Sequence, residues 1–436
     1  MRDSILEACL MAMVLSATDG VFTRPSLGSF LALAAGWVLC RTRRTTTGLI
    51  VAADAAQTKH FSSYHRLFSQ AAWSARRFWL GILQVAVRRL CPSGPLVLVG
   101  DDTVQGKCGR KISGASNWRN ACGSTRQQYR FLWGLDLIIL GLAVGFRGKT
   151  FCLPVNLCLY RKEADCRRSG RPYHTRNELM REMVQEALEA LPGRPLVLLA
   201  DGHFATRTLL SKVPPNLTAI TPLRRDAAIW RLPGPRERGA KGRPAAKGPR
   251  LPPPEALARD GRRPWQVTPG GRRVKTFEVL WYGVIKAQRI RLVIVRQKNP
   301  REPYEYFLCT DPSWTPDAIL STYARRWTIE ITIRDAKQHG GLADAQCRAA
   351  QAVEPQHAFT LGMMTLVMAW YMDVGHQSDR LGLWPWYRHK RGPTFLDMLA
   401  HARRRSLVAR FSINSAPNPD IVKNAEALTH YLRTAA

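Results

Sequence analysis

The first part of the chain, residues 1 to about 90, carries its apolar side chains at helical spacing. Residues 5–15 and 27–40 repeat this pattern most clearly, which predicts amphipathic helices. Stretches rich in Arg, Thr, Ser and Tyr follow them at 41–47 and 60–69. Such side chains suit contacts with phosphates. The same helices could equally form a cap that packs on the next domain.

A different pattern begins near residue 95, where the apolar runs become short and continuous. Residues 96–99 and 196–199 are wholly apolar, which predicts two buried strands that end next to Asp101 and Asp201. The pattern also predicts a hairpin of two strands at 130–142 and 149–160, and a helix at 177–191. A further helix begins at 204–210, and another short strand follows at 217–221. Together these elements predict a mixed α/β core.

Residues 231–275 break the pattern, because Pro, Gly and Arg dominate there and no apolar face can form. This composition predicts a loop or a flexible basic segment. Strands are predicted to follow at 274–282, 290–295 and 304–310, so the region resembles a β-rich insertion. Its aromatic side chains either offer a surface on which a base can stack or fill a small β core. They are Trp265, Trp281, Tyr282 and Trp314.

A long helix is predicted over 315–339. Thr315 can cap it, Pro316 suits its first turn and Asp317 suits the positive end of its dipole. The glycines at 340–341 end it. A buried helical segment is expected at 359–372.

The charge balance narrows the class of partner. Lys and Arg total 65 against 32 Asp and Glu, a formal net charge of +33. A folded protein this basic needs a polyanion, and nucleic acid is the commonest one because phosphate contacts release counterions. A hydrophobic content of 45% is enough for real cores and argues against a disordered chain.

The spacing of the cysteines and the length of the apolar runs indicate whether the chain binds zinc and in which cellular compartment it lies. No Cys-x-x-Cys pair occurs among the ten cysteines, which argues against a zinc site and favours a reduced cytoplasm. The N-terminus lacks the features of a secretory signal. The longest apolar run, 131–146, contains Asp136 and several glycines and is not a clean membrane span. We therefore expect a cytoplasmic protein with no membrane partner.

The helix at 315–339 carries the residues with chemical potential. Tyr323, Arg326, Glu330 and Lys337 fall near one helical face, with Arg334 close to it. A salt-bridged solvent face would also interleave charges in this way. The apolar residues among them allow the helix to pack while it presents a polar stripe.

At this point the chain becomes recognisable. The pattern Tyr323-x-x-Arg326-x-x-x-Glu330-x-x-x-x-x-x-Lys337 resembles the Y-R-E-K signature of bacterial insertion-sequence transposases of the DDE superfamily. Asp101-Asp102-Thr103 resembles their first-aspartate motif, usually Asp-x-Thr, and the stretch 198–202 around Asp201 resembles the second. The resemblance covers most of the chain.

The resemblance implies an α/β fold: a ribonuclease-H-like mixed-sheet catalytic core with a β-rich insertion and an N-terminal helical DNA-binding domain. The implied divisions are a helical DNA-binding domain (1–92), the first part of the core (93–225) and the basic loop with the insertion (226–312). The last part of the core (313–375) and a basic helical C-terminal region (376–436) follow.

The resemblance also implies a site. Asp101, Asp201 and Glu330 would be the catalytic carboxylates and would hold two Mg²⁺ or Mn²⁺ ions, which prefer hard oxygen ligands. Asp102 is the alternative to Asp101, because adjacent strand residues point to opposite faces; the Asp-x-Thr register favours Asp101. The residues expected to contact DNA are Tyr323, Arg326, Arg334, Lys337, Arg41, Arg43, Arg44, His65 and Arg66.

The function implied by the resemblance is that of a cut-and-paste DNA transposase in the bacterial nucleoid. Such an enzyme binds terminal inverted repeats, cleaves double-stranded DNA and joins the 3′ ends to target DNA, as a homodimer. Two alternatives are a catalytically inactive DNA-binding protein derived from a transposase, and a ribonuclease-H-like nuclease that acts on RNA.

Overall fold

The computed structural model describes residues 6–120, 123–125, 127–235, 242–378, 390 and 392–414, the last four of these by their backbone. The chain forms two compact units. We call the described parts of 1–93, 102–173 and 330–436 the first unit, and Gly94–Asp101 with His174–Ile329 the second unit. Of the C-terminal region expected at 376–436, the stretches 379–389, 391 and 415–436 lie outside the described residues.

The N-terminal residues are helical, as the periodicity predicts. Local caps begin several of these helices: the Thr45 and Ser74 side chains accept from the backbone N–H groups three residues on, and Pro25 lies in the first turn of α2. The helices are α1 (Ala8–Ala17), α2 (Arg24–Leu39), α3 (Thr46–Ala52), α4 (Phe61–Ser69) and α5 (Ala75–Leu90).

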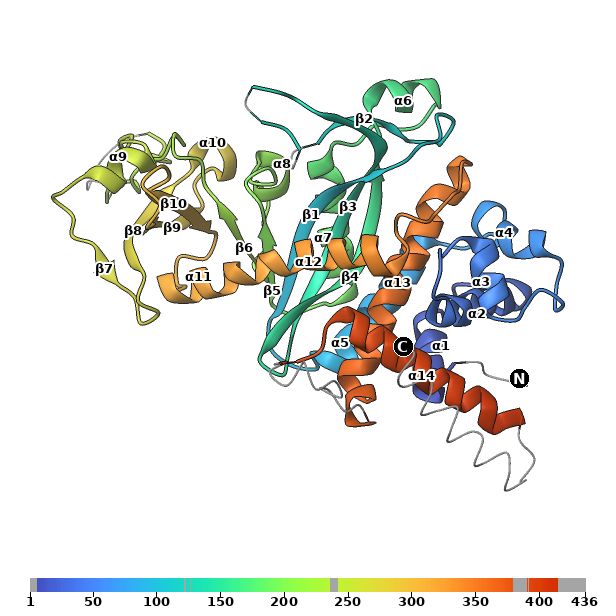
Figure 1. Ribbon diagram of the computed structural model, residues 1–436. Helices are drawn as coiled ribbons and strands as arrows, with labels where there is room; N and C mark the ends of the chain where they lie inside the picture. The colour runs from blue at the N-terminus through green and yellow to red at the C-terminus, as the bar shows by residue number, and fades with distance from the viewer. Residues whose placement is uncertain are drawn as a thin grey trace. The chain divides into compact units, whose positions relative to one another are not determined.

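The centre of the first unit is helix α13 (Ala350–Asp373), seen beside α1, α5 and β4 in Figure 1. Every residue from Gln356 to Met372 is buried, as expected for a helix that is apolar on all sides. It packs against α1, α2, α4, α5, α14 (Phe395–Asn414) and β4. The predicted buried segment is therefore confirmed, and it extends further toward the N-terminus than the apolar run.

The strands of the first unit are joined by one tight hairpin. Strand β3 (Phe131–Phe146) pairs antiparallel with β4 (Lys149–Tyr160), as predicted. Arg147 and Gly148 connect them, both with positive φ (47° and 76°), which is the two-residue turn that suits the twist of a hairpin. Strand β2 (Ser116–Arg119) also pairs with β3, and the order in this unit is β2-β3-β1, with β4 on β3.

Strand β1 (Leu96–Gly106) is longer than predicted. Its residues up to Asp101 belong to the second unit and its continuation to the first. The expectation that the strand ends at the aspartates is therefore wrong, because polar side chains from residue 101 onward are half-buried and the backbone still pairs with a neighbour. Asp101 and Asp102 both lie inside strand β1.

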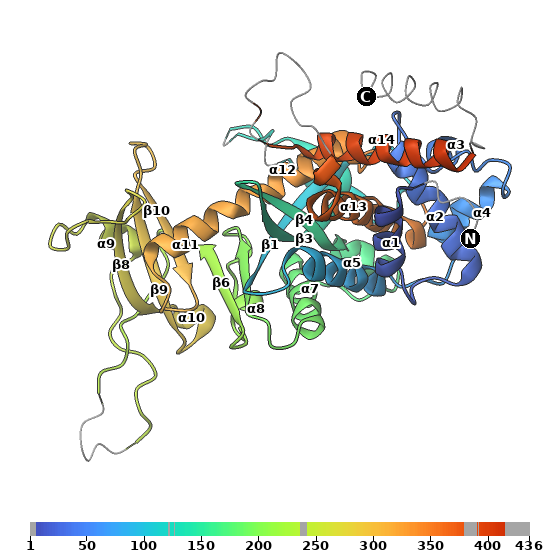
Figure 2. The same ribbon diagram turned by 90° about the horizontal axis from the view of Figure 1, so that it is seen from below.

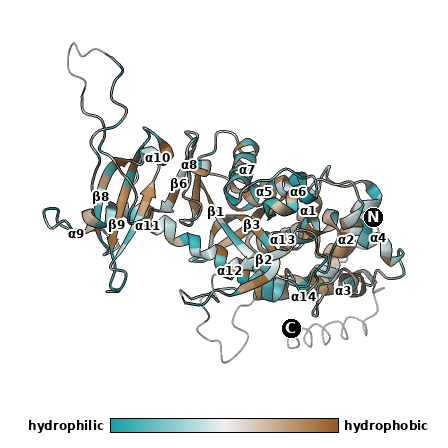
Figure 3. Cartoon of the chain, turned by 90° about the horizontal axis from the view of Figure 1, so that it is seen from above, coloured by the Kyte–Doolittle hydropathy of each residue, from teal (hydrophilic) through white to brown (hydrophobic). Residues whose placement is uncertain are grey.

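In the second unit the hydrogen-bonded order is β1-β5-β6-β10-β9-β8-β7. The pairs β1/β5 and β5/β6 are parallel and the others are antiparallel. The predicted insertion therefore continues the core sheet through the β6/β10 pair. Figure 3 shows β9 largely in the hydrophobic colour, and its central residues are buried. The strands are β5 (Leu196–Ala200), β6 (Leu217–Pro222), β7 (Gln266–Val267), β8 (Arg273–Leu280), β9 (Arg289–Arg296) and β10 (Tyr304–Cys309).

The segment predicted to lack structure, 231–275, is partly ordered, so that expectation is wrong in part. Helix α9 (Pro254–Arg259) forms because Pro254 suits a first turn and Leu257 and Ala258 are buried. Residues 236–241 of this segment lie outside the described residues. The other helices of the second unit are α7 (Arg176–Ala190), α8 (Arg207–Leu210) and α10 (Tyr282–Ile285).

The long helix predicted at 315–339 begins and ends as expected but is not regular. The Thr315 side chain caps α11 (Pro316–Tyr323), and Gly341 ends the helical path in the left-handed conformation. Between them lie a 3₁₀ turn (Ala324–Arg326), α12 (Trp327–Asp335) and a π-helical turn (Ala336–Gly340). These irregular turns fall at Arg326 and Lys337, so the uniform face predicted for the four signature residues is interrupted.

The mixed α/β arrangement is consistent with the expected ribonuclease-H-like fold. In the part of the chain that the structure describes, no helix is long and apolar enough to cross a membrane.

Candidate active site

Asp101 and Asp201 follow paired positions on two parallel strands. Gly100 of β1 pairs with Ala200 of β5, so the two aspartates come next along neighbouring strands of the second unit. Strand β5 ends at Ala200, whereas β1 continues past Asp101, so the two aspartates lie at the point where the parallel β1/β5 pairing ends. Asp201 accepts a hydrogen bond from the His203 backbone N–H at 2.7 Å, which fixes the turn after β5.

Arg326 faces Asp101. Its Nη1 lies 3.5 Å from Asp101 Oδ2, and both side chains are largely buried, at 16% and 15% exposed. Adjacent strand residues point to opposite faces, so this contact identifies Asp101, rather than Asp102, as the residue of β1 that faces the signature helix within the second unit. The positive charge of Arg326 offsets repulsion between neighbouring carboxylates.

Tyr323 lies close to the same two aspartates. The pKa of Tyr323 is raised to about 12, chiefly by burial; Arg326 opposes this rise, and the charges of Asp201 and Asp101 contribute to it. Its ring packs on Phe307 of β10 with centroids 4.9 Å apart, and Figure 2 shows α11 beside β6 and β10. At neutral pH the Tyr323 hydroxyl is therefore a hydrogen-bond donor, aimed by a packed ring.

Glu330 lies on α12 in the first unit and is half-buried. Its neighbours Ile329 and Ile333 are buried, and the Thr332 hydroxyl donates to the Cys152 carbonyl of β4 at 2.7 Å. The Thr332 hydrogen bond and the buried Ile333 pack α12 within the first unit. Within the described residues, no three His, Cys, Asp or Glu side chains come together as a metal-binding group.

Lys337 lies in the π-helical turn and reaches strand β1. Its Nζ donates to the Thr103 hydroxyl at 2.8 Å and to the Val104 carbonyl at 2.9 Å. A π-helical turn shifts the phase of a helix locally and is frequent at functional sites. Here it aims the ammonium group at the strand residues that directly follow the two aspartates.

The end of this helical path is held by the N-terminal helices. Arg44 donates from Nη1 to the His339 carbonyl at 2.6 Å, and its backbone N–H donates to Asp344 at 2.8 Å. The Trp37 indole donates to the Gly340 carbonyl at 2.9 Å. A cation at the carbonyl end of a helix is favourable, so these contacts anchor the turn that bears Lys337.

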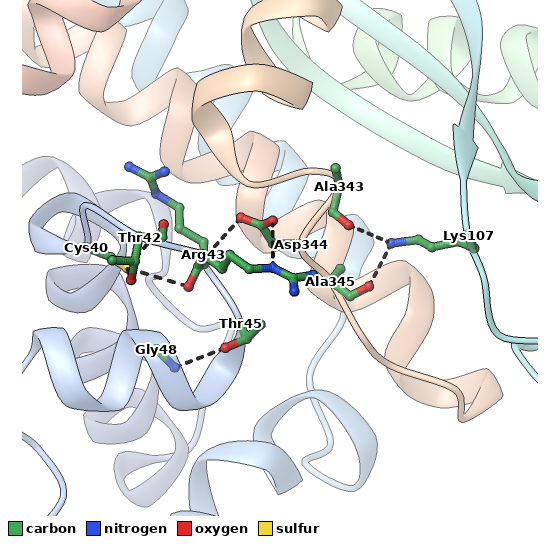
Figure 4. Close-up of polar contacts among 10 residues, drawn as sticks. Cys40, Thr42, Arg43, Thr45, Gly48, Lys107, Ala343, Asp344 and Ala345 are labelled. Atoms are coloured by element: carbon green, nitrogen blue, oxygen red, sulfur yellow. Dashed lines mark hydrogen bonds and ion pairs between the residues drawn. The ribbon is translucent and has the colours of Figure 1, made fainter.

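The loop after this turn is also held by the residue that directly follows β1. Lys107 donates to the Ala345 carbonyl at 2.7 Å and to the Ala343 carbonyl at 3.4 Å. Figure 4 shows Arg43 and Lys107 reaching the 343–345 loop from different elements. Sequence reasoning did not single out Lys107 or Asp344. Neither had a local signal, since each acts through a partner more than 200 positions away.

The remaining predicted DNA-contacting residues lie on the surface, with one exception. Arg44 is half-buried and is engaged with His339 as described. Arg43 also lies 3.8 Å from Asp344, and Arg334 pairs with Asp335 at 3.1 Å. The exposed residues are Arg41, Arg43, His65, Arg66 and Arg334.

The insertion aromatics pack partly against one another. Trp265 stacks on Tyr304 with centroids 5.7 Å apart and an interplanar angle of 10°. Tyr282 meets Trp230 edge-on at 6.2 Å. Trp265 and Tyr282 thus take part in the packing of the insertion, and both remain half-buried.

Comparison with known proteins gives one family match. The model of the family described as DDE superfamily endonuclease matches residues 21–286. The matched span includes Asp101 and Asp201 and ends before α11. No curated protein matches the chain.

Proposed function

Because the chain belongs to the DDE superfamily endonucleases, we propose that it is a DNA transposase of the cut-and-paste type. It binds the terminal inverted repeats of its element, cleaves the DNA and joins the 3′ ends to target DNA. The observation that supports this most is the pair Asp101 and Asp201, which follow paired positions on parallel strands, with Arg326 against Asp101. The arrangement combines carboxylates with a phosphate-binding cation.

In this proposal Asp101, Asp201 and Glu330 are the catalytic carboxylates and hold divalent metal, generally Mg²⁺ in the superfamily. Carboxylate oxygens are the ligands that Mg²⁺ and Mn²⁺ prefer. Such ions, held by these three carboxylates, would activate the attacking hydroxyl group and stabilise the leaving oxygen. Glu330 is assigned as the third carboxylate because it occupies the glutamate position of the Y-R-E-K pattern, four residues after Arg326.

The signature residues orient the DNA. The Tyr323 hydroxyl donates a hydrogen bond to a phosphate oxygen, since its pKa of about 12 keeps it protonated. Arg326 clamps the phosphate next to Asp101, because a guanidinium can bind two oxygens at once, and Lys337 and Arg334 add positive charge. Asp102, on the opposite face of β1, is the alternative first ligand that the Arg326 contact disfavours.

The N-terminal helices bind the end of the element. Arg41 and Arg43 on the segment after α2, with His65 and Arg66 on α4, are exposed and suit phosphate contacts. Arg44 contributes to DNA binding indirectly, because its own guanidinium binds the His339 carbonyl. It holds Arg43 and the 343–345 loop in place. Cutting two ends together requires two active sites, so the active species is a homodimer on DNA.

The proposal is tested with a plasmid that carries the coding region and its flanking DNA. Incubation with the protein and Mg²⁺ is expected to produce nicks at the element ends, free 3′-hydroxyls and joined products. The same assay on RNA–DNA hybrids is the control for a ribonuclease. Metal-dependent cleavage confined to the RNA strand, or no cleavage of either substrate, would contradict the proposal.

A further inference from the structure

The end of α2 holds the π-helical turn that carries Lys337. The Trp37 indole N–H donates to the Gly340 carbonyl at 2.9 Å, and Arg44 Nη1 donates to the His339 carbonyl at 2.6 Å. All of these residues belong to the first unit. The last carbonyls of a helix have no partner within it, so two donors from a distant segment of the chain supply what the turn itself lacks.

Trp37 is the centre of this contact. Its side chain is fully buried, and its carbonyl accepts from Arg44 Nε at 3.1 Å. The Arg44 guanidinium lies 5.1 Å from the centroid of its ring, so Trp37 also holds the second donor in place. Gly340 is buried as well, and a buried carbonyl that loses its donor is costly. The indole N–H therefore stabilises the turn in its present form.

Lys337 occupies the second position of this turn and is aimed at strand β1. Its Nζ donates to the Thr103 hydroxyl and the Val104 carbonyl. The turn closes on the Ala336 carbonyl, which accepts from the Leu342 backbone N–H at 3.0 Å. A π-helical turn spans one residue more than an α-helical turn. Relaxation to the α-helical spacing would therefore turn Lys337 away from β1.

We propose that Trp37 is a positioning residue for DNA cleavage: it keeps the π-helical turn in register, so that Lys337 stays aimed at the strand residues that follow Asp101 and Asp102. This role rests on the proposed function, in which Lys337 adds positive charge next to the DNA phosphate. Trp37 itself contacts no DNA, because its side chain is buried. The N-terminal helices thereby act on the rate of cleavage and not only on the binding of DNA.

The test uses the full-length protein with two matched substitutions, Trp37→Phe and Trp79→Phe. Both tryptophans are buried in the first unit, so each change removes the same atoms from a packed core. Among the described residues, the Trp79 indole N–H has no hydrogen-bond partner, so only Trp37→Phe removes a bond to the turn. Each substitution is also combined with Lys337→Met. Cleavage of element-end DNA in Mg²⁺ is measured at saturating DNA, and DNA affinity is recorded separately.

Trp37→Phe is expected to lower the cleavage rate at saturating DNA about tenfold, since a small misplacement of a positioned group is enough for such a loss. Its DNA affinity should stay within about twofold, as should the cleavage rate of Trp79→Phe. In the Lys337→Met background, Trp37→Phe should lower the rate by no more than about twofold further, because residues that act as a unit are not additive.

Two results would overturn the positioning role. One is a rate loss in Trp79→Phe equal to that in Trp37→Phe, since the effect would then come from packing. The other is a full further loss of rate when Trp37→Phe is added to Lys337→Met, since Trp37 would then act on cleavage without Lys337.

Urea unfolding of the same variants tests the link between Trp37 and Lys337 without any catalysis. Lys337→Met should shift the unfolding equilibrium about fivefold less in the Trp37→Phe background than in the Trp79→Phe background, because residues in one hydrogen-bond network are coupled. Failure of the unchanged protein to cleave DNA would overturn the proposed function, while this coupling would still show that Trp37 holds Lys337. Equal shifts in the two backgrounds, in a protein that cleaves DNA, would overturn the positioning role alone.

Discussion

Lys337 Nζ and the Thr103 hydroxyl lie 2.8 Å apart, although the two residues are 234 positions apart in the chain. The bond ties the π-helical turn at the end of the signature helix to the strand that carries Asp101 and Asp102. Lys337 of the Y-R-E-K pattern is therefore hydrogen-bonded directly to Thr103 of the Asp-x-Thr pattern. Both belong to the first unit.

This bond is expected to stabilise the fold measurably. Lys337→Met and Thr103→Val should each lower the free energy of unfolding by about 1–3 kcal/mol, since the donor is charged. The double variant should lose less than the sum, with a coupling of about 1 kcal/mol. Urea unfolding of the four proteins measures this, with the exposed Lys111→Met as control. Strict additivity would show that the two side chains do not interact.

Gly341 is expected to tolerate no side chain. Its φ is 82°, and an added Cβ would lie 2.6 Å from Cβ of Arg44. Gly341→Ala should therefore cost more than the backbone strain of roughly 1–2 kcal/mol that positive φ imposes. Gly20→Ala is the matched control, because its φ is 63° and nothing lies within 4 Å. Equal losses of unfolding free energy in the two variants would contradict the role of Arg44 at this turn.

Tyr323 is expected to act as a donor and not as a base. Because its pKa is about 12, the phenol stays protonated through neutral and mildly alkaline pH. Tyr323→Phe should lower the rate of DNA cleavage by about tenfold, the effect of losing a hydrogen bond of roughly 1.4 kcal/mol. The pH–rate profile should keep its shape below about pH 9. Disappearance of an ionisation from that profile would show instead that Tyr323 moves a proton.

His357 is expected to make the protein sensitive to acid. It is fully buried on α13, and burial lowers its pKa from 6.5 to about 4. The unfolded chain therefore binds a proton more readily than the folded one between these values, so the stability from this site is complete above pH 6.5 and is lost as pH falls toward 4. The loss should reach about 3 kcal/mol.

The measurement for His357 is the unfolding free energy of the unchanged protein and of His357→Gln between pH 7.5 and about 4. The difference between the two curves should change over that interval, because Gln does not titrate. Two parallel curves would mean that the imidazole is accessible to protons in the folded state.

Local sequence signals predicted much of this fold. Helical periodicity located the N-terminal helices, two apolar runs located the β3/β4 hairpin, and Thr315 and Gly341 located the ends of the signature helix. These features depend on neighbours a few residues away. They can be recognised for that reason without any knowledge of tertiary packing.

Features that depend on distant partners could not be predicted in this way. Strand β1 continues beyond the aspartates because a neighbouring strand pairs with it, not because its own residues are apolar. Arg44 resembles the exposed arginines around it in sequence, yet it binds the carbonyl of His339. The 3₁₀ and π turns were not predicted either, and they interrupt the regular helical face expected for the signature residues.

Cleavage of DNA by Glu330 variants measures whether Glu330 acts together with Asp101 and Asp201. Cleavage of element-end DNA in Mg²⁺ is compared for the unchanged protein, Glu330→Gln and the exposed control Glu302→Gln, with DNA binding recorded for each. Glu330→Gln is expected to lose cleavage while its DNA affinity stays within about twofold, and Glu302→Gln is expected to match the unchanged protein in both. Full Mg²⁺-dependent cleavage by Glu330→Gln would contradict it.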